Sequence, residues 1–193
     1  MFTKDLSFIG WDEVKRRQLE RVSLAPQWIE LTNLAPGMIV VDIGPGPGVF
    51  TREYAKVVGK PGKVYAIEKS PQAIEFLQIG LKKLDNVQVR LADAEHGLTD
   101  IPQPDVAFVT DVLHHTDSPR DVLKSIFELV HSNSKILIAE YDPAADGKVG
   151  PPLEHRLDAN VLFELATEVG FTVESTETQD HEHYYLLLRP AKL

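Results

Sequence analysis

A glycine-rich turn near the start of the chain is the clearest chemical signal in the sequence. An apolar run over residues 38–41 ends in Asp42, and glycines then occupy every second position from 44 to 48. Glycine has no Cβ, so its backbone can approach a ligand closely and can take positive φ at little cost. Val49 stands where a dinucleotide fingerprint has its third glycine. No Lys-Ser/Thr pair follows, which excludes a triphosphate loop, and Asp42 would repel a pyrophosphate but attract a cationic amine or sulfonium.

Three more acids, Glu68, Asp93 and Asp111, stand where later apolar runs end. In an open α/β sheet the ligand binds beyond the carboxyl ends of the strands, so we expect these acids around one site. Glu68 lies 24 positions after Gly44 (68 − 44), close to where an acid binds a ribose diol in this type of fold. An ionised carboxylate can accept both hydroxyl hydrogen bonds. Each acid taken alone could equally cap a helix or pair with a neighbour such as Lys69.

Strand and helix patterns alternate through most of the chain and would position these residues. We predict strands over 38–42, 63–68, 87–92, 104–111 and 135–141, and helices over 49–58, 71–84, 119–130 and 158–169. Ser70 and Pro71 are typical of a helix start. Such alternation predicts parallel βαβ units with right-handed crossovers.

The end of the chain breaks this alternation. Two strands are expected over 171–176 and 184–189, and the polar residues between them are too few for a helical crossover, so they must pair antiparallel. The predicted fold is therefore α/β: a Rossmann-like, doubly wound, mostly parallel seven-stranded sheet with an antiparallel C-terminal edge hairpin and helices on both faces.

The first 34 residues carry two short helix patterns, over 12–22 and 25–34. We expect this segment, 1–34, to act as a lid over the ligand mouth of a single domain that runs from 35 to 193. Phe8, Ile9 and Trp11 would supply its apolar contacts. The alternative is that these residues only anchor the first helix.

Composition narrows the class of protein. The chain has 193 residues, a formal net charge of −9 and no cysteine, which excludes disulfides, thiolate nucleophiles and Cys-rich zinc sites. The acidic balance argues against broad nucleic-acid binding. No apolar run approaches the roughly 20 residues of a membrane span, and the N-terminus does not resemble a signal peptide. We therefore expect a cytoplasmic protein without a membrane span.

Four motifs in order resemble those of class I S-adenosylmethionine (SAM)-dependent methyltransferases. They are VVDIGPGPG, AIEKS, LADAE and FVTDVLHHTDSP, at residues 40–48, 66–70, 91–95 and 108–119, and the closing hairpin also fits that family. The stretches DVLHH and GPPLEHRL are most similar to its small-molecule branch, which contains ubiquinone and menaquinone C-methyltransferases. The resemblance covers the chain from about Leu34 onward. It implies SAM as cofactor, S-adenosylhomocysteine as product, and a small-molecule methyl acceptor for a monomer or homodimer.

The resemblance also assigns cofactor-binding roles to residues of this sequence. Gly44, Gly46 and Gly48 would let the backbone approach the methionine portion, with Pro45 stiffening the turn. Asp42 would orient the turn and help to hold the amino group, and Glu68 would bind both ribose hydroxyls. The adenine would lie against Lys69, Asp93 and Ala94, and Asp111 would lie beside the amino-acid portion.

The acceptor side is less defined. His114 and His115 follow the fourth strand, and either could take a proton from the acceptor near neutral pH; each could equally be a packing or capping histidine. Tyr141 could orient the acceptor, while His155 and Arg156 lie in the following loop, where Arg156 could bind an anion. His181 and His183 form a His-x-His pair, but no full ligand set of known spacing is visible, so we expect no metal.

Other functions remain open at this stage. No feature of the sequence excludes a non-catalytic SAM-binding module. An NAD-dependent oxidoreductase is disfavoured by Val49 and by the reversed last strand, and an RNA or protein methyltransferase by the acidic charge and by Thr110-Asp111-Val112-Leu113 in place of an Asn/Asp-Pro-Pro-Tyr/Phe signature.

Overall fold

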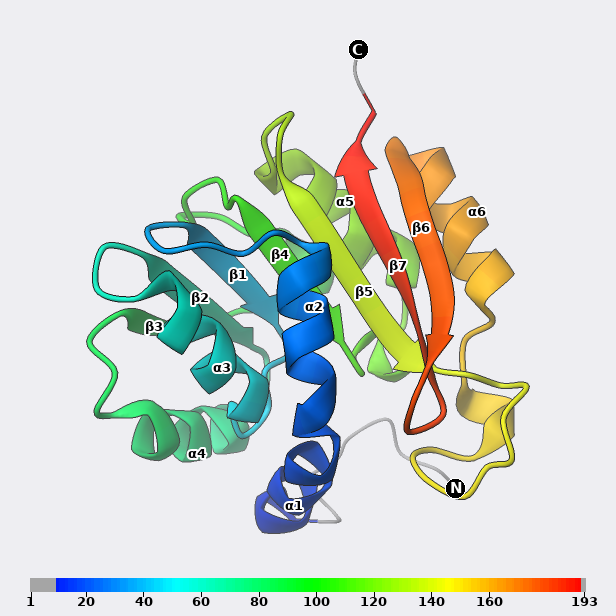
Figure 1. Ribbon diagram of the computed structural model, residues 1–193, viewed down its shortest axis with the longest axis horizontal. Helices are drawn as coiled ribbons and strands as arrows, with labels where there is room; N and C mark the ends of the chain where they lie inside the picture. The colour runs from blue at the N-terminus through cyan, green and yellow to red at the C-terminus, as the bar shows by residue number, and fades with distance from the viewer. Residues whose placement is uncertain (1–9, 192–193) are drawn as a thin grey trace.

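A seven-stranded sheet forms the centre of the computed structural model, which describes residues 10–191 (Figure 1). Its strand order is β3-β2-β1-β4-β5-β7-β6. The strands are β1 (Ile39–Ile43), β2 (Lys63–Glu68), β3 (Val87–Leu91), β4 (Val106–Thr110), β5 (Lys135–Tyr141), β6 (Phe171–Gln179) and β7 (His183–Pro190). The first five pair in parallel, and β7 runs antiparallel between β5 and β6. The predicted fold class is confirmed.

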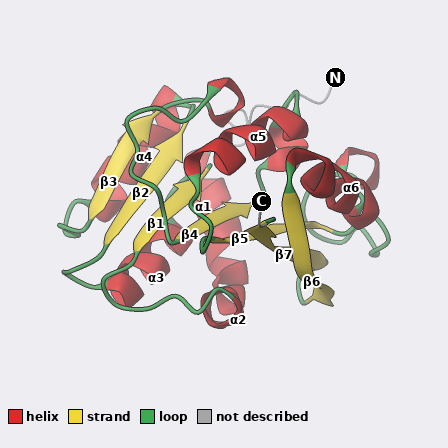
Figure 2. Ribbon diagram, turned by 90° about the horizontal axis from the view of Figure 1, so that it is seen from above, coloured by secondary structure: helices red, strands yellow, loops and turns green. Residues whose placement is uncertain are grey.

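Helices cover both faces of the sheet. In the described residues they are α1 (Trp11–Arg21), α2 (Ala25–Leu31), α3 (Val49–Val58), α4 (Pro71–Leu81), α5 (Pro119–Leu129) and α6 (Ala159–Val169). Figure 2 shows α2 and α3 on one side of the sheet and α5 and α6 on the other. All five side chains of β4 are buried, as expected for a strand covered on both faces.

Alternation along the strands divides the core into two layers. In β4, Ala107 and Val109 pack toward α5 and α6, whereas Val106 and Phe108 pack toward α2 and α3. The ring of Phe108 stacks on Tyr54 of α3 with a centroid distance of 3.8 Å. This packing fixes where each strand ends relative to its neighbours, and so where the side chains that follow it lie.

Local signals fixed most element boundaries. The Ser70 hydroxyl accepts a hydrogen bond from Ala73 N at 3.3 Å at the start of α4, and Gly170 ends α6 with φ 118°. The predicted end of the sixth strand at Thr176 is wrong, because β6 continues to Gln179. Its last residues pair with β7 by backbone hydrogen bonds on the outer edge of the sheet, where no apolar side chain is needed. The turn is therefore only residues 180–182, with His181 and Glu182 both at φ 59°.

Helix α1 lies beside the carboxyl ends of the parallel strands, below the sheet in Figure 1. The Gln18 side chain ties it to the glycine turn: Nε2 donates to Pro45 O at 3.0 Å, and Val49 N donates to Oε1 at 3.3 Å. This position supports the proposed lid, which stays a prediction. Phe8 and Ile9 lie outside the described residues. No helix within residues 10–191 has both the length and the apolarity to span a membrane.

Candidate active site

A cavity of ≈ 750 Å³ opens at the carboxyl ends of β1, β2, β3, β4 and β5. It lies where the strand order reverses between β1 and β4, which is where ligands bind in this fold class. Ten of the cofactor- and acceptor-site candidates line it, and so does Trp11 of the expected lid; the ten are Gly44, Gly46, Glu68, Lys69, Asp93, Ala94, Asp111, His114, His115 and Tyr141. Asp42, Pro45, Gly48, His155 and Arg156 are not among its lining residues.

Glu68 lies at the tip of β2 with its carboxylate held by backbone. Gly46 N donates to its Oε2 at 3.2 Å and Ser70 N donates to its Oε1 at 2.9 Å. Burial raises the pKa of Glu68, and these backbone hydrogen bonds partly offset the shift. A carboxylate has about four acceptor positions, and the backbone groups of Gly46, Ser70 and Lys69 leave room for hydroxyl donors from a ligand. The geometry therefore fits a ribose diol.

Asp93 and Ala94 form the next part of the wall. The Asp93 carboxylate accepts a hydrogen bond from Glu95 N at 3.0 Å and so caps the short 3₁₀ turn Ala94–His96. Lys69 is half exposed, with its Nζ 3.5 Å from Glu95. Lys69, Asp93 and Ala94 therefore line the cavity beside Glu68.

The structural reason for a glycine differs at the three glycine positions of the turn. A Cβ on Gly46 would point toward α1, 3.5 Å from Gln18 Nε2 and 3.8 Å from the Trp11 ring, at the cavity wall. A Cβ on Gly48 would instead meet Leu77 Cδ1 of α4 at 2.6 Å. The expected role of Gly48 in cofactor approach is therefore corrected: the chain needs a glycine there for helix packing. Gly44 lines the cavity, but a Cβ on it would also overlap the Val112 side chain.

Asp42 faces away from the cavity. Its side chain is 1% exposed, and its Oδ2 accepts a hydrogen bond from the Thr51 hydroxyl of α3 at 2.6 Å. Burial raises the pKa of Asp42 to about 7, the Thr51 hydrogen bond lowers it, and the Glu68 charge raises it further. The assignment of Asp42 to the amino group of a ligand is corrected, because the side chain connects β1 to α3 and orients the turn from behind.

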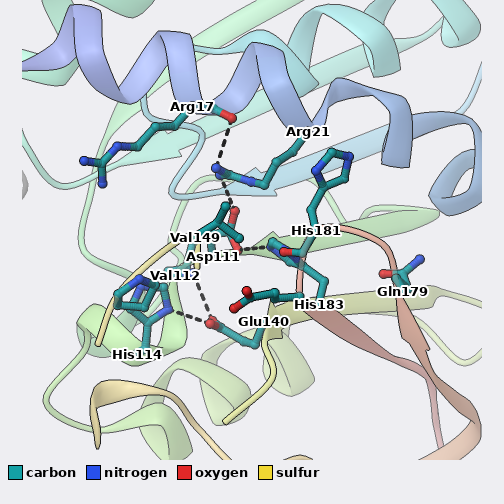
Figure 3. A network of polar contacts seen from close by, with 12 residues as sticks. Arg17, Arg21, Asp111, Val112, His114, Glu140, Val149, Gln179, His181 and His183 are labelled. Atoms are coloured by element: carbon teal, nitrogen blue, oxygen red, sulfur yellow. Dashed lines mark hydrogen bonds and ion pairs between the residues drawn. The ribbon is translucent and has the colours of Figure 1, made fainter. Parts of the chain in front are cut away.

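Asp111 follows β4 and is the centre of a polar network (Figure 3). Its Oδ2 accepts from Arg21 Nη2 of α1 at 2.6 Å, and its Oδ1 lies 2.8 Å from His183 Nε2 of β7. Burial alone would raise the pKa of Asp111, but the Arg21 and His183 charges outweigh it and hold the pKa well below its usual range. Asp111 adopts φ 58°, a left-handed conformation that non-glycine residues rarely take and that often marks functional sites. The side chain therefore fixes α1 over the cavity.

His114 forms a buried pair with Glu140 at the end of β5. Its Nδ1 lies 2.5 Å from Glu140 Oε2, and the two side chains are 3% and 1% exposed. The other carboxylate oxygen, Oε1, accepts backbone N–H groups from Val112 at 3.0 Å and Leu113 at 2.6 Å. Burial alone would lower the pKa of His114, but the Glu140 charge and hydrogen bond outweigh it, so the pKa is raised.

His115 and Tyr141 complete this side of the cavity. The rings of His114 and His115 lie 4.0 Å apart, and the ring of Tyr141 lies 6.1 Å from that of His114. Burial raises the pKa of the Tyr141 phenol, so the hydroxyl stays protonated across the physiological range. Both histidines and Tyr141 are thus brought together, as the sequence led us to expect.

Arg156 and His155 are placed elsewhere. The Arg156 side chain is fully buried and bonded: Nη1 donates to Asp142 O and to Glu182 Oε2, each at 2.8 Å, and Nε donates to Pro151 O at 3.0 Å. It is therefore not available to an anionic acceptor, and that expectation is corrected. Its bonds hold the loop after β5 against the β6–β7 turn and so place Gly150, Pro151 and Pro152 in the cavity wall. His155 belongs to the short 3₁₀ turn Leu153–His155 in the same loop.

The histidines near the C-terminus have protein partners. His183 Nδ1 is 2.7 Å from His181 O, and His181 Nε2 is 3.1 Å from the Ser23 hydroxyl. Within the described residues no cluster of three or more His, Cys, Asp or Glu side chains is arranged to hold a metal ion.

Comparison with known proteins identifies the class. Residues 34–187 match the family model described as a methyltransferase domain. The chain therefore belongs to this family, the class I SAM-dependent methyltransferases, and its cofactor is SAM.

Curated relatives carry several activities. The chain is 30% identical over 175 residues to the ubiquinone/menaquinone biosynthesis C-methyltransferase UbiE of Ectopseudomonas mendocina, over 86% of this chain and 62% of that protein. It is also 30% identical over 112 residues to the protein-L-isoaspartate O-methyltransferase of Pyrococcus horikoshii, over 57% of this chain and 47% of that protein. The chain thus spans about half to three fifths of the length of these relatives.

Solved structures agree in fold. A SAM-dependent methyltransferase from Aquifex aeolicus superposes with a TM-score of 0.85 at 21% identity, over 94% of this chain and 98% of that one. The N-methyltransferase NodS from Bradyrhizobium japonicum, in complex with S-adenosylhomocysteine, gives 0.67 at 15% identity, over 95% and 89%. At these identities the likeness shows the fold alone.

Sequence reasoning missed three residues of the site: Gln18, Arg21 and Glu140. Arg21 is 8% exposed, and its Nε has no hydrogen-bond partner in the part of the chain that the structure describes. Glu140 looked like an ordinary member of an apolar strand; its charge within the run ILIAEY was the signal that could have found it. A charge in a strand buried on both faces requires a partner.

Proposed function

We propose that this chain is an enzyme that transfers the methyl group of SAM to a small-molecule acceptor by in-line displacement. One observation carries the proposal: a single cavity joins the Glu68–Asp93 wall to the wall of His114, His115 and Tyr141. When bound, SAM supplies an electrophilic methyl group on a sulfonium whose thioether leaves without protonation.

The cofactor half of the cavity would be held by backbone and carboxylates. In the proposal Glu68 accepts from the ribose hydroxyls, and Asp93, Ala94 and Lys69 flank the adenine. The backbone of Gly44 and Gly46 faces the methionine portion, and Asp111 lies at its far end. The fit rests on the free acceptor positions of Glu68 and on the Cβ-free wall at Gly46, which any larger side chain would fill.

The acceptor half of the cavity would hold the methyl acceptor in line with the methyl group. His114, His115 and Tyr141 contact the acceptor, while α1 and the loop with Gly150, Pro151 and Pro152 exclude water. Holding two reactants in line inside a shielded site supplies much of the rate enhancement of such a transfer. The size of the cavity, ≈ 750 Å³, lies within the range of about 300–1,000 Å³ typical of small-molecule sites.

Two measurements test the proposal. Calorimetry with S-adenosylhomocysteine should show binding, whereas NAD should give none and should not raise the melting temperature, because only a ligand of the folded state does so. Tritium from methyl-labelled SAM should then enter small molecules of a metabolite extract. Binding without any transfer would favour a non-catalytic SAM-binding module, and label in RNA or protein fractions alone would contradict a small-molecule acceptor.

A further inference from the structure

The buried pair of His114 and Glu140 lies at the acceptor end of the cavity, and the fold needs only one oxygen of Glu140, which accepts from the backbone of Val112 and Leu113. Burying two ionisable groups costs free energy, and well-packed apolar residues in their place are often neutral or stabilising. The pair nevertheless has well-defined hydrogen-bond partners. The Glu140 carboxylate receives three hydrogen bonds: from His114 Nδ1, Val112 N and Leu113 N.

The hydrogen bonds to Glu140 determine the tautomer of His114. A carboxylate that accepts from two backbone N–H groups on one oxygen is favoured in its ionised form. An ionised carboxylate can only accept, so His114 Nδ1 must be the donor. In neutral His114 the lone pair is then on Nε2. His114 lines the cavity, and its Nδ1 is taken up by Glu140, so Nε2 is the ring nitrogen left for a ligand.

The charges around His114 come from each element packed against it. Glu140 of β5 contacts it directly, Asp111 at the end of β4 adds a second negative charge, and Arg21 of α1 opposes both. His115 and Tyr141 are the ring neighbours. The two carboxylates outweigh the one guanidinium, so the surroundings of His114 favour the protonated imidazolium that a general base becomes.

We propose that His114 is the general base of the methyl transfer, that Glu140 is its positioning residue, and that the acceptor belongs to the class that must lose a proton on methylation: a phenol, an enol or a carbon acid next to a carbonyl. This rests on the proposed function. The acceptor gives its proton to His114 Nε2, and the freed electron pair forms the bond to the methyl carbon. The methyl–sulfur bond breaks at the same time, and its electron pair stays on sulfur. The proton remains on His114 as imidazolium, neutralised by Glu140, and later leaves to water.

His131 is the matched control, because it is a histidine beside Asp105 before the start of β4 and does not line the cavity. His114→Asn keeps an amide N–H that can donate to Glu140 but has no base. It should lower transfer of label from tritiated SAM into a metabolite extract by about a hundred-fold or more, the usual contribution of a general base. His131→Asn should leave the transfer within about two-fold of the wild type, and both variants should bind S-adenosylhomocysteine like the wild type.

Glu140→Gln tests the positioning role with a readout that a purely structural residue would not move. The glutamine oxygen can still accept from Val112 and Leu113, but its amide then donates to His114 Nδ1 and places the proton on Nε2. Nitrogen NMR of histidine-labelled protein, recorded at a pH above the pKa of His114, should show the Nδ1–H tautomer in the wild type and the Nε2–H tautomer in Glu140→Gln. Transfer by the variant should fall together with this switch, while S-adenosylhomocysteine affinity and the melting temperature confirm that the chain is folded.

The outcomes separate the proposed roles of His114 and Glu140, called the relay below, from the proposed function. Transfer that survives His114→Asn, or a wild-type His114 protonated on Nε2 when neutral, overturns the relay alone. A labelled product methylated on a tertiary amine or a thioether, which lose no proton, overturns the acceptor class. A wild type that binds S-adenosylhomocysteine but transfers no label contradicts the proposed function, and the relay with it.

Discussion

The two halves of the cavity are built in different ways. In the cofactor half, the ligand-facing groups follow β1, β2 and β3 directly, and most of their hydrogen bonds join residues close in the chain or use backbone, as between Glu68 and Ser70 at 2.9 Å. In the acceptor half, side chains bond to other side chains far away in sequence. His114 bonds Glu140, 26 residues away, and Asp111, where the two halves meet, bonds Arg21 and His183, which are 90 and 72 residues away.

The difference shows how one fold can combine a cofactor site built largely on backbone groups with an acceptor site built on side chains. Backbone groups at strand ends are present whatever the side chains are, so the cofactor half is insensitive to most substitutions. The acceptor half depends on which residues the ends of β4, β5 and β7 and the helix α1 bring together.

The largest loss of cofactor affinity is expected from a substitution of Glu68. Glu68→Ala removes the side chain proposed to bind the ribose and should weaken S-adenosylhomocysteine binding by about a hundred-fold or more, since hydrogen bonds to a charged group are worth about 1.5–3 kcal/mol each. Calorimetry measures this affinity. Glu75→Ala, on the exposed face of α4, is the matched control. Affinity within a few-fold of the wild type in Glu68→Ala would refute the ribose assignment.

Substitutions at two glycines of the turn should have different effects, one on cofactor affinity and the other on stability. Gly46→Val would put side-chain atoms at the cavity wall against Gln18 and Trp11, and should lower S-adenosylhomocysteine affinity by about ten-fold or more. Gly48→Ala would overlap Leu77 and should instead lower the free energy of unfolding by about 1–3 kcal/mol.

Both glycines have positive φ, so a control for backbone strain is needed. Gly97 has φ 100°, and a Cβ added to it would meet no atom within 4 Å, so Gly97→Ala carries the strain alone. Calorimetry and denaturant unfolding of the three variants separate binding from stability. Unchanged affinity in Gly46→Val would mean that the turn does not face the cofactor.

Stability should also depend on pH, because ionisable groups in both halves of the cavity and behind it have shifted pKa values. The folded-state pKa values of Asp42, Glu68 and His114 are all raised, Asp42 to about 7. In each case the folded chain binds more protons than the unfolded chain, so stability must fall as pH rises from about 4 through 7 and above. Asp42 alone would account for a loss of roughly 2–4 kcal/mol between pH 4 and pH 7.

Asp42→Asn isolates this contribution. The asparagine can still accept from the Thr51 hydroxyl but does not titrate, so the fall of unfolding free energy between pH 4 and pH 7 should become much shallower. Below about pH 4.5 both proteins should lose stability, because the pKa of Glu182 is lowered by its bonds to Arg156 and backbone even though burial opposes the shift. Denaturant unfolding at several pH values measures both slopes; equal slopes in the two proteins would place a charged Asp42 in the folded state.

The order of the strands and helices could be read from sequence because its signals are local. Apolar runs, the Ser70 cap, the glycine turns and the short link before β7 each act within a few residues, and the structure moves their boundaries only slightly. For the same reason, Glu68 and Asp93 could be placed at strand ends and therefore at the cavity.

Side-chain direction and long-range pairing were decided only by the tertiary structure. Asp42 and Glu68 lie at or near strand ends and on the same face of the sheet, yet the hydrogen bond from Thr51 holds the Asp42 side chain against α3, out of the cavity lining. From the sequence Arg156 was expected to be available to a ligand, but in the fold Glu182 of the β6–β7 turn forms an ion pair with it. The partnership of His114 with Glu140 exists because β4 and β5 are neighbours in the sheet, and that adjacency depends on how the whole core packs rather than on the residues around either side chain.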